Sequence, residues 1–414
     1  MRVFIATHGC RANQYDSEAV RAMLIAAGHE IAASAADADT AVFNSCAVTA
    51  QAEADLRHGV RRAARENPAL ATVVMGCAAA LDRGAIGALP GVRAVVPGAD
   101  LVQLARALGV DPALATARAA RQTGSRALLR IQDGCDEHCT FCATTLARGA
   151  SRSRDPRSLV DEARRLAEHH AEIVLTGVHI GAYGADTGGS LGALVERLVR
   201  AVPAARFRLS SVEATEVDDR LRELLVDPES GLVPWLHAPL QSGSDRVLRR
   251  MGRHWYTAGG YAAAIERIAR DAPVLGLGAD VIAGFPGEGA EDHRATLALV
   301  NALPFTALHV FPYSVRPGTA AERLGERVHD AGIRERAAEL RRAGERKGEA
   351  HRRSRDGGKA DVVVIGGGGS AQRHGLTEDN LTVVPTDQAL PRGTRFRARL
   401  ELEGSDLFAV PAAW

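Results

Sequence analysis

The chain has 414 residues, which is long enough for about three domains of ordinary size. Hydrophobic residues make up 46% of it and charged residues 24%, so the composition excludes a disordered, collagen-like or coiled-coil protein. The 51 basic residues nearly balance the 50 acidic ones, which excludes a polycation but allows a local basic groove. The longest apolar run, 69–81, is shorter than a membrane span, and the first ten residues lack the apolar core of a signal peptide. We therefore expect a cytoplasmic protein with no membrane partner.

In the first hundred residues, short apolar runs alternate with alanine-rich stretches of helical spacing. The runs with strand character are 2–6, 41–43 and 72–75. The helical stretches are 14–27 and 49–65. This alternation predicts a parallel α/β domain over residues 1–110. The pattern then weakens into Ala, Arg, Pro and Gly, which predicts a linker over 111–126.

Three dispersed cysteines each follow one of these predicted strands: Cys10, Cys46 and Cys77. The loops at the carboxyl ends of parallel strands lie along one edge of a sheet, where ligands bind. We therefore expect the three thiols to converge there. The alternative for any one of them alone is a buried, inert thiol.

A second α/β run occupies residues 127–350. Its predicted strands are 127–132, 172–176, 206–211, 234–238, 277–283 and 306–311. Helical segments such as 159–169 and 261–270 separate them. About six such units predict a partial (β/α)6 barrel, whose active site would lie at the carboxyl ends of its strands.

The last part of the chain changes character. Residues 331–353 form an arginine-rich helical pattern, and short alternating runs then predict a small β domain over 351–414. The glycine run 366–369 is followed by neither a helix nor a lysine–serine pair, so we interpret it as a flexible turn rather than a nucleotide loop.

The strongest chemical signal is the spacing C-x3-C-x2-C formed by Cys135, Cys139 and Cys142. Three thiolates on a short loop can bind three irons of a [4Fe–4S] cluster and leave the fourth iron open to a small molecule. Structural zinc with His138 as a fourth ligand is an alternative, but it would need a very tight fold of the loop. A buried thiol cluster without metal is another.

With Phe141 before its last cysteine, this motif resembles that of the radical S-adenosylmethionine (SAM) superfamily. The resemblance implies that Cys135, Cys139 and Cys142 are the catalytic cluster ligands, and that the open iron chelates the methionine part of SAM. The cluster would then donate an electron that cleaves the sulfonium and gives a 5′-deoxyadenosyl radical.

Further motifs along nearly the whole chain resemble those of the methylthiotransferases. They are THGCRANQYDSE (7–18), NSCAVT (44–49), GCAA (76–79), RLSSVEATE (208–216), LHAPLQSGSDRVLRRMGR (236–253), GADVIAGFPGE (278–288) and HVFPYSVRPGTAA (309–321). The terminal β domain resembles the RNA-binding TRAM module. The segments IQDGC, LTGVHIGAYG (175–184) and SSVEA are closest to the branch that modifies threonylcarbamoyladenosine in tRNA.

The resemblance implies that Cys10, Cys46 and Cys77 hold a second [4Fe–4S] cluster, whose open iron would carry the sulfur to be inserted. It also implies two uses of SAM, one as methyl donor and one as radical source. The implied substrate is threonylcarbamoyladenosine at position 37, beside the tRNA anticodon, and the implied reductant is of flavodoxin or ferredoxin type. The sequence leaves the sulfur donor open.

Five further residues are candidates for binding the cofactor, together with Phe141. Thr176 and Gly177 end a strand where the backbone could meet the methionine part, and Glu213 is placed to accept hydrogen bonds from ribose hydroxyls. Gln241 and Asp280 occupy similar strand-end positions. An ordinary turn or a structural carboxylate is the alternative for each.

Arginines supply the candidate RNA contacts. Those in the loop after the cysteine motif are Arg148, Arg152, Arg154 and Arg157. Arg316 lies in a separate loop, and Arg395 and Arg397 share one face of a predicted strand with Arg399. Such patches would attract phosphate and bind an anticodon loop. A solvated arginine-rich surface is the alternative.

Two departures from the family pattern stand out. Residues 143–146 replace bulky apolar residues and a Pro-Tyr pair, and His8 replaces a leucine; we interpret His8 as a simple substitution rather than a ligand.

Rival functions are methylthiolation of isopentenyladenosine in tRNA or of a ribosomal-protein aspartate. A non-catalytic iron–sulfur sensor that binds RNA is a rival of another class.

Overall fold

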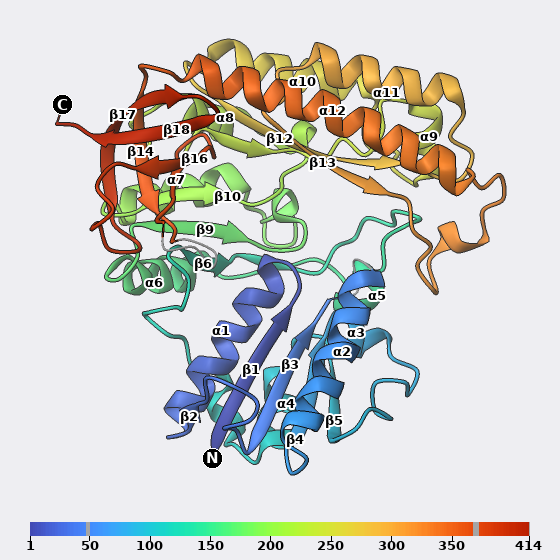
Figure 1. Ribbon diagram of the computed structural model, residues 1–414, viewed down its shortest axis with the longest axis vertical. Helices are drawn as coiled ribbons and strands as arrows, with labels where there is room; N and C mark the ends of the chain where they lie inside the picture. The colour runs from blue at the N-terminus through green and yellow to red at the C-terminus, as the bar shows by residue number, and fades with distance from the viewer. Residues whose placement is uncertain (47–49, 367–371, 414) are drawn as a thin grey trace.

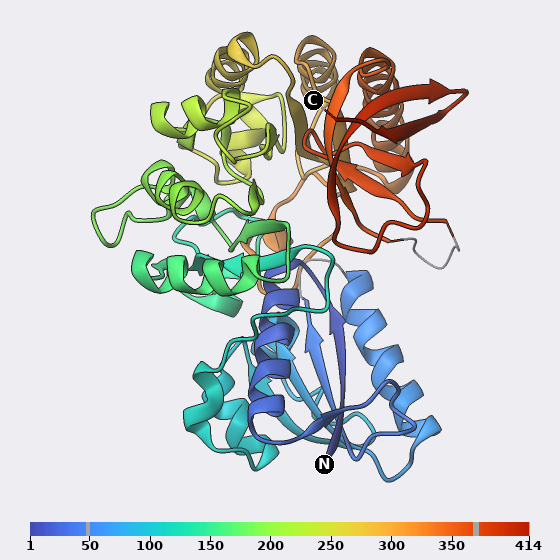
Figure 2. The same cartoon turned by 90° about the vertical axis from the view of Figure 1, so that its left-hand side faces the viewer.

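The computed structural model describes residues 1–46, 50–366 and 372–413. Figure 1 shows an amino-terminal α/β domain below, an arc of parallel strands and helices above it, and a small barrel at one end of the arc. In the 90° view the amino-terminal domain lies beneath the arc and the small barrel stands to one side (Figure 2). No helix among the described residues has both the length and the apolar character needed to cross a bilayer.

The amino-terminal domain is a five-stranded parallel sheet of order β2-β1-β3-β4-β5. Its strands are β1 (Arg2–His8), β2 (Glu30–Ile31), β3 (Thr40–Ser45), β4 (Ala71–Gly76) and β5 (Val92–Pro97). Its helices are α1 (Arg11–Ala26), α2 (Ala50–Glu66), α3 (Cys77–Leu81) and α4 (Leu101–Leu108), followed by the 3-10 turn η1 (Pro112–Thr116). The three predicted strands and both predicted helices are confirmed.

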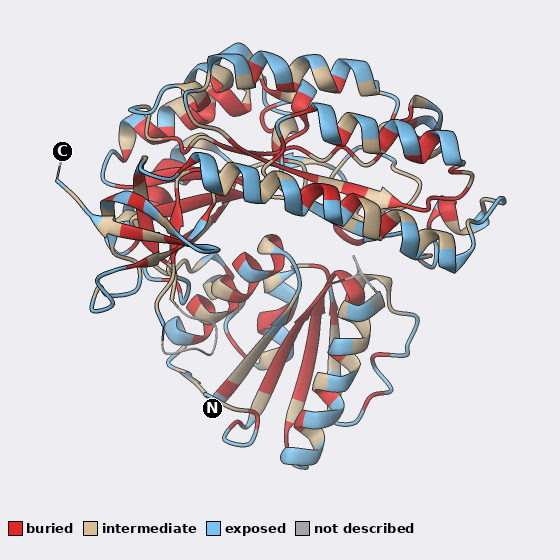
Figure 3. Ribbon diagram, turned by 45° about the horizontal axis from the view of Figure 1, so that its top comes forward, coloured by how far each residue is buried: buried red, intermediate tan, exposed pale blue. Residues whose placement is uncertain are grey.

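Burial explains why the central strands are continuous apolar runs. Both faces of β3 and β4 are covered, so nearly every residue of these strands is buried (Figure 3). Leu56 and Val60 of α2 pack in the core on one side, and Met23 of α1 and Leu104 of α4 pack in the core on the other. The sheet is therefore buried on both faces, and the carboxyl ends of its strands face the arc above (Figure 1).

The second unit is the predicted partial barrel. Its strands are β6 (Ala127–Arg130), β9 (Glu172–Thr176), β10 (Arg206–Leu209), β11 (Trp235–His237), β12 (Gly276–Ala283) and β13 (Ala307–Pro312). They form two parallel three-stranded sheets, joined between β10 and β11 by the bridges Phe207↔Leu232 and Ser211↔His237. In the described part of the chain no pairing joins β6 to β13, so the barrel stays open. The prediction of six units rather than eight is confirmed.

Except for α5 (Thr144–Arg148), which lies beside α3 of the amino-terminal domain, the helices of this unit lie on the outside of the arc (Figure 1). These outer helices are α6 (Pro156–Ala167), α7 (Leu191–Ala201), α8 (Asp219–Val226), α9 (Asp245–Arg250), α10 (Ala258–Asp271), α11 (Ala290–Ala302) and α12 (Asp330–Ser354). Short 3-10 turns are η2 (Ile180–Ala182), η3 (Ala214–Glu216) and η4 (Ala320–Arg323). A hairpin of β7 (Gln132–Asp133) and β8 (Arg152–Ser153) encloses the cysteine motif.

The carboxyl-terminal unit is a closed five-stranded barrel of order β14-β15-β16-β18-β17. Its strands are β14 (Lys359–Val364), β15 (Gly375–Thr377), β16 (Thr382–Pro385), β17 (Arg395–Glu403) and β18 (Asp406–Pro411). The predicted small β domain is confirmed. Residues 367–369 of the glycine run lie outside the described residues.

An ionic cluster fixes this small barrel against the arc. Glu172 of β9 is fully buried and pairs with Arg126, Arg206 and Arg208. Arg206 and Arg208 also donate to backbone carbonyls of the small barrel. The accepting residues are Asp361, Leu376, Thr377 and Glu378. The three arginines hold the pKa of the Glu172 carboxyl far below its usual value despite its burial.

Candidate active site

The sheet brings Cys10, Cys46 and Cys77 to one edge. His8 of β1 is in register with Ser45 of β3, and Ser45 is in register with Gly76 of β4, so the chain leaves all three strands at one level. Cys46 and Cys77 are buried and Cys10 is exposed, and none of them forms a disulfide.

Glycines next to two of these cysteines allow the close approach. A Cβ on Gly9 would lie 3.0 Å from Cys46 Cβ and 2.5 Å from Asn13 Oδ1. Gly76 has φ of +99°, and a Cβ there would lie 2.4 Å from the Ser45 carbonyl oxygen. Any side chain at these two positions would separate the three loops.

A buried amide network supports the same loops. Asn13 Nδ2 donates to Asn44 Oδ1 at 3.0 Å and to the Ser45 carbonyl at 3.1 Å, and Asn44 Nδ2 donates to the Asn13 carbonyl at 2.7 Å. The thiol of Cys10 donates to Asn13 Oδ1 at 3.4 Å. Both amides are fully buried, so this network holds together the loops that carry Cys10 and Cys46.

The second group of thiols lies on the loop between β7 and α5. Backbone N–H groups of this loop donate to its sulfurs, from Glu137 to Cys135 Sγ and from Thr144 to Cys142 Sγ, each at 3.4 Å. His179 Nδ1 lies 3.7 Å from Cys135 Sγ, and its Nε2 lies 2.7 Å from Glu216 Oε1. Burial would lower the pKa of His179, but these two hydrogen bonds raise it to about 10.

Each thiol group has one arginine against it. Arg148 Nε donates to Cys77 Sγ at 3.3 Å, and Arg253 Nη1 donates to Cys139 Sγ at 3.6 Å. Burial is the largest cause that raises the pKa of Cys77 to about 11 and that of Cys139 to about 12. Repulsion from neighbouring thiolates contributes to these raised values, and the arginines oppose the shift. Two triads of crowded, partly desolvated thiols therefore fit cationic metal clusters.

A cavity of about 120 Å³ joins the two thiol groups. It is lined by Cys77 of the first group and Cys142 of the second, with Phe141, Ala147 and Arg316 among the other lining residues. Phe141 packs edge-on against Phe285, with ring centroids 6.3 Å apart. Arg316 is half-buried, and burial lowers its pKa while the nearby Glu53 and Cys46 raise it.

Two predicted cofactor contacts carry buried oxygen atoms without partners. Thr176 ends β9, and its Oγ1 has no hydrogen bond within the described residues. Glu213 follows β10; its Oε1 pairs with Arg253, and its Oε2 has no partner in the same part of the chain. Unpaired buried oxygens are costly, so both atoms fit a polar ligand such as the ribose and amino groups of SAM.

The other predicted cofactor contacts have structural explanations. A Cβ on Gly177 would lie 2.6 Å from the Gln132 carbonyl oxygen, so tight packing alone requires glycine there. Gln241 adopts a left-handed backbone with φ of +61°, an uncommon conformation for a non-glycine residue, and its N–H donates to the Asp280 carbonyl at 2.8 Å.

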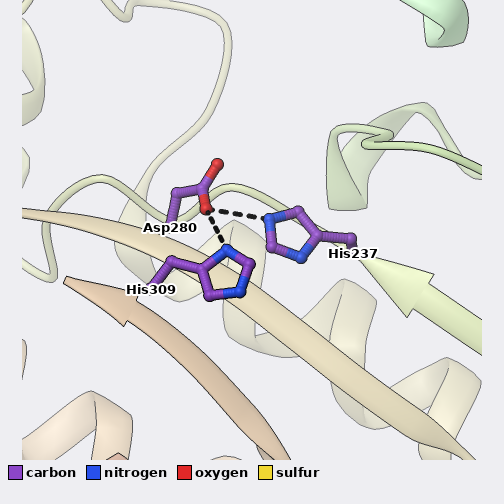
Figure 4. Close-up of side chains that lie close together, drawn as sticks. All are labelled: His237, Asp280 and His309. Atoms are coloured by element: carbon purple, nitrogen blue, oxygen red, sulfur yellow. Dashed lines mark hydrogen bonds and ion pairs between the residues drawn. The ribbon is translucent and has the colours of Figure 1, made fainter. Parts of the chain in front are cut away.

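Asp280 lies within β12 rather than at its end, and two histidines flank it (Figure 4). His237 Nε2 lies 2.9 Å from Asp280 Oδ1, and His309 Nδ1 lies 3.3 Å from the same oxygen. Burial would raise the pKa of Asp280, but the two histidines hold it well below its usual value. Asp280 is therefore already partnered by protein, which removes the strand-end argument for a cofactor contact.

Two of the predicted RNA-binding arginines are engaged inside the protein: Arg148 is buried, which corrects the prediction for it, and the partly exposed Arg154 is held by protein partners. Arg148 is buried between Asp16, at 2.8 Å, and Asp133, at 3.1 Å. Arg154 pairs with Glu162 at 2.7 Å and donates to the Tyr15 hydroxyl at 3.0 Å. Both join the amino-terminal domain to the barrel, because Asp16 and Tyr15 belong to α1. Their charge is used inside the protein.

Of the other predicted RNA contacts, Arg316 is half-buried in the wall of the thiol cavity and the rest are exposed. Arg152 is exposed beside the cysteine loop, and Arg395, Arg397 and Arg399 are exposed at alternate positions of β17, as predicted. Arg395 also pairs with Asp361 at 2.7 Å.

The two departures from the family pattern are local. Ala143 and Ala147 are buried, whereas Leu146 is exposed, with 59% of its surface accessible. His8 stacks on Phe43 with ring centroids 6.1 Å apart, and burial lowers its pKa. Stacking on Phe43 gives His8 a packing role in place of the apolar side chain.

Comparison with protein-family models gives two matches. The model described as "Uncharacterized protein family UPF0004" matches residues 2–98, and the "Radical SAM superfamily" model matches residues 129–300. The threonylcarbamoyladenosine tRNA methylthiotransferase MtaB of Bacillus subtilis is 37% identical over 81% of this chain and 78% of its own length. The MtaB of Rickettsia prowazekii is 32% identical over 97% of this chain and 95% of its own.

This chain belongs to the radical SAM methylthiotransferase family. It is therefore an enzyme that uses SAM and [4Fe–4S] clusters. A tRNA-2-methylthio-N(6)-dimethylallyladenosine synthase of Parafrankia is also similar, at 34% identity over 88% of this chain and 78% of its own length.

Solved structures agree on the fold. TsrM of Kitasatospora setae, a radical SAM methyltransferase solved with cobalamin and a [4Fe–4S] cluster bound, matches with a TM-score of 0.59. The match covers 78% of this chain and 77% of TsrM at 15% identity, so it supports the fold alone.

Several residues around the site escaped the sequence analysis. They are Asn13, Asn44, His179, Glu216 and Arg253. Each lies inside a motif quoted above, so the motifs marked their positions. Nothing in the spacing indicated which thiol or amide each one would contact.

Proposed function

We propose that this protein is a tRNA methylthiotransferase that inserts sulfur at carbon 2 of threonylcarbamoyladenosine 37 and methylates it. Relatives with this activity in their names match over most of the chain, five of them at 31–37% identity. Relatives named for the dimethylallyl nucleoside match at 33–34%. The sequence difference between the two groups is small, so the substrate needs a direct test.

One observation carries the proposal: a single cavity is lined by a thiol from each triad, Cys77 and Cys142. Activation of an unreactive aromatic C–H and delivery of sulfur are separate chemical tasks, and a shared cavity lets both act on one base. Cys135, Cys139 and Cys142 would hold the cluster that supplies the electron for cleavage of SAM. Cys10, Cys46 and Cys77 would hold the second cluster.

The surrounding residues would position the ligands. Thr176 Oγ1 and Glu213 Oε2 would bind SAM through the hydrogen bonds that the protein leaves unmade. Phe141 would exclude water from the cavity beside Cys142, and Arg316 would bind substrate or phosphate at the cavity wall. A reductant of flavodoxin or ferredoxin type would supply the electron.

The domain division follows the same scheme. Residues 1–110 would carry the second cluster, 127–350 the SAM-binding barrel and 351–414 the TRAM-like RNA-binding domain. The exposed arginines of β17 would contact the anticodon loop of tRNA, and the reaction would take place in the cytoplasm.

The nucleoside profile of tRNA from a deletion strain tests the substrate. We expect mass spectrometry to show loss of the 2-methylthio derivative of threonylcarbamoyladenosine and accumulation of its unmodified precursor. Restoration by a plasmid copy of the gene is the control. Loss of the methylthio isopentenyl nucleoside instead, or of neither, would reject the proposed substrate.

A further inference from the structure

A second cavity, of about 340 Å³, lies where the three domains meet. One wall is a face of α1 that includes Arg11 and Arg21, and another is the segment 122–126, which leads into β6 and ends in Arg126. Arg392, from the small barrel, reaches the same cavity. Four arginines line it, and Glu18 is the one acidic side chain among its lining residues in the described part of the chain.

Among the described residues, Arg21 pairs with Glu18 and Arg126 with Glu172, whereas Arg392 and Arg11 have no such partner. Arg11 is the one next to a cysteine of the first triad. Its side chain is half-buried, and within the described residues it makes no hydrogen bond or ion pair. The nearby carboxylate of Glu172 is already shared by three other arginines. The pocket therefore carries positive charge that the protein leaves uncompensated.

The position of Arg11 places this charge beside the reaction site. Arg11 directly follows Cys10, a member of the first thiol triad. Its charge acts on Arg126 beside β6, and it also acts on His309 of β13. Strand β6 is one end of the open barrel, and the cavity that Arg11 lines extends to Leu128 of this strand.

We propose that Arg11 and Arg126 bind the carboxylate of the substituent that threonylcarbamoyladenosine carries on N6. This inference rests on the proposed function and adds the group by which the enzyme would recognise its substrate. A threonylcarbamoyl group ends in an ionised carboxylate, whereas a dimethylallyl group is apolar. Arginine binds carboxylates through two parallel hydrogen bonds, so this pocket would favour the acidic substituent. An apolar substituent would leave the guanidinium groups unpaired, which would weaken its binding.

The reacting carbon 2 and the recognised N6 substituent lie close enough together in the base for this assignment. Carbon 2 and the N6 substituent flank N1 on the same edge of adenine. A base that presents carbon 2 to the thiol triads therefore brings the substituent to the same side. Arg11 directly follows Cys10, so the cavity that Arg11 lines begins next to the first triad.

The test compares two anticodon stem-loops that differ only in the threonyl carboxylate, one with the free acid and one with its methyl ester. Their affinities for the anaerobically reconstituted holoenzyme are measured by fluorescence anisotropy. We expect wild type to bind the acid about 10- to 100-fold more tightly, because the contribution of one hydrogen bond to a charged group changes affinity by a factor in this range. We expect Arg11→Gln to lose most of the preference, because only Arg126 then remains for the carboxylate. We expect Arg11→Lys to retain more of it, because lysine keeps the charge but lacks the planar fork.

Arg106→Gln is the matched control, because Arg106 is exposed on α4 of the same domain and its substitution removes the same charge. Iron content and melting temperature report whether each variant folds, and the wild-type comparison needs no variant. Equal binding of acid and ester by wild type would overturn the proposal. So would an Arg11→Gln variant that weakens both RNAs and keeps the preference, since Arg11 would then bind a backbone phosphate. Failure of the proposed function is a different result: wild type would methylthiolate only the dimethylallyl stem-loop.

Discussion

Cys46 is the thiol on which the interpretation of two clusters depends most. It is buried at the end of β3, a Cβ on Gly9 would lie 3.0 Å from it, and its charge acts on Arg316 in the shared cavity wall. Cys46 belongs to none of the hydrophobic core clusters of the described residues. It lies close enough to Cys77 to raise the pKa of that thiol, which favours a role as a ligand.

We expect Cys46→Ala to separate the two chemistries. Iron and sulfide should fall to about half of the wild-type content, because one [4Fe–4S] cluster loses a ligand. Reductive cleavage of SAM should continue and the methylthio nucleoside should be lost. Iron analysis and chromatography of 5′-deoxyadenosine and of RNA digests measure these three quantities. Cys139→Ala is the control, since it should abolish both activities; an unchanged product yield in Cys46→Ala would show that the dispersed triad is dispensable.

At this scale the sequence predicted the thiols but not their neighbours. The spacing of Cys135, Cys139 and Cys142 is local, so it can be recognised without a fold. Arg148 was predicted to contact RNA because three arginines follow it closely. Its actual partner Asp16 lies 132 residues away, and no local pattern encodes that ion pair. A run of arginines therefore predicts charge but not exposure.

Helix α1 is the element that connects the two halves of the site. It begins after Cys10, and its side chains reach the barrel at two points. The Tyr15 hydroxyl donates to Glu162 of α6 at 3.0 Å, and Asp16 accepts from Arg130 and Arg148. The orientation of α1 therefore sets the relation between the dispersed triad and the cysteine loop.

We expect Arg148→Gln and Arg152→Gln to have opposite effects although both lie in the same arginine-rich segment. Loss of Arg148 leaves Asp16 and Asp133 less compensated, and breaking such a buried pair costs about 3–5 kcal/mol in the free energy of unfolding. Arg152 is exposed, so its loss should change that free energy by less than about 1 kcal/mol and weaken RNA binding instead. Denaturant titration of each variant and RNA anisotropy provide the measurements. A stable Arg148→Gln variant with weakened RNA binding would restore the original prediction for Arg148.

The elements themselves were largely predictable. The fully buried strands β3, β4 and β9 are apolar runs bounded by polar residues, and the structure places strands there. The edge strands β2 and β5 were missed because β2 has two residues and β5 is only partly buried. Short or exposed strands depend on pairing with a neighbour, which periodicity does not report.

Across the whole molecule, the small barrel is fixed to the arc more firmly than a tethered RNA-binding module would be. Its backbone carbonyls satisfy the buried guanidinium groups of Arg206 and Arg208. Deletion of residues 351–414 would remove those acceptors and expose the Glu172 cluster. A truncated protein would therefore lose stability as well as RNA contacts, so the role of this domain is better tested by substitutions on its exposed face.

The exposed face of β17 offers such a test, because Arg397 and Arg399 alternate with buried Ala398 and Leu400. We expect the double variant Arg397→Ala/Arg399→Ala to bind the stem-loop more weakly and with less dependence on salt. Each lost phosphate contact on single-stranded RNA lowers the slope of log K against log salt by about 0.7, so two contacts predict a decrease of about 1.4. The control is Arg346→Ala/Arg353→Ala, which removes the same charge from the exposed side of α12. If both double variants changed the slope equally, general charge rather than this face would govern binding, and the RNA-binding role of β17 would be rejected.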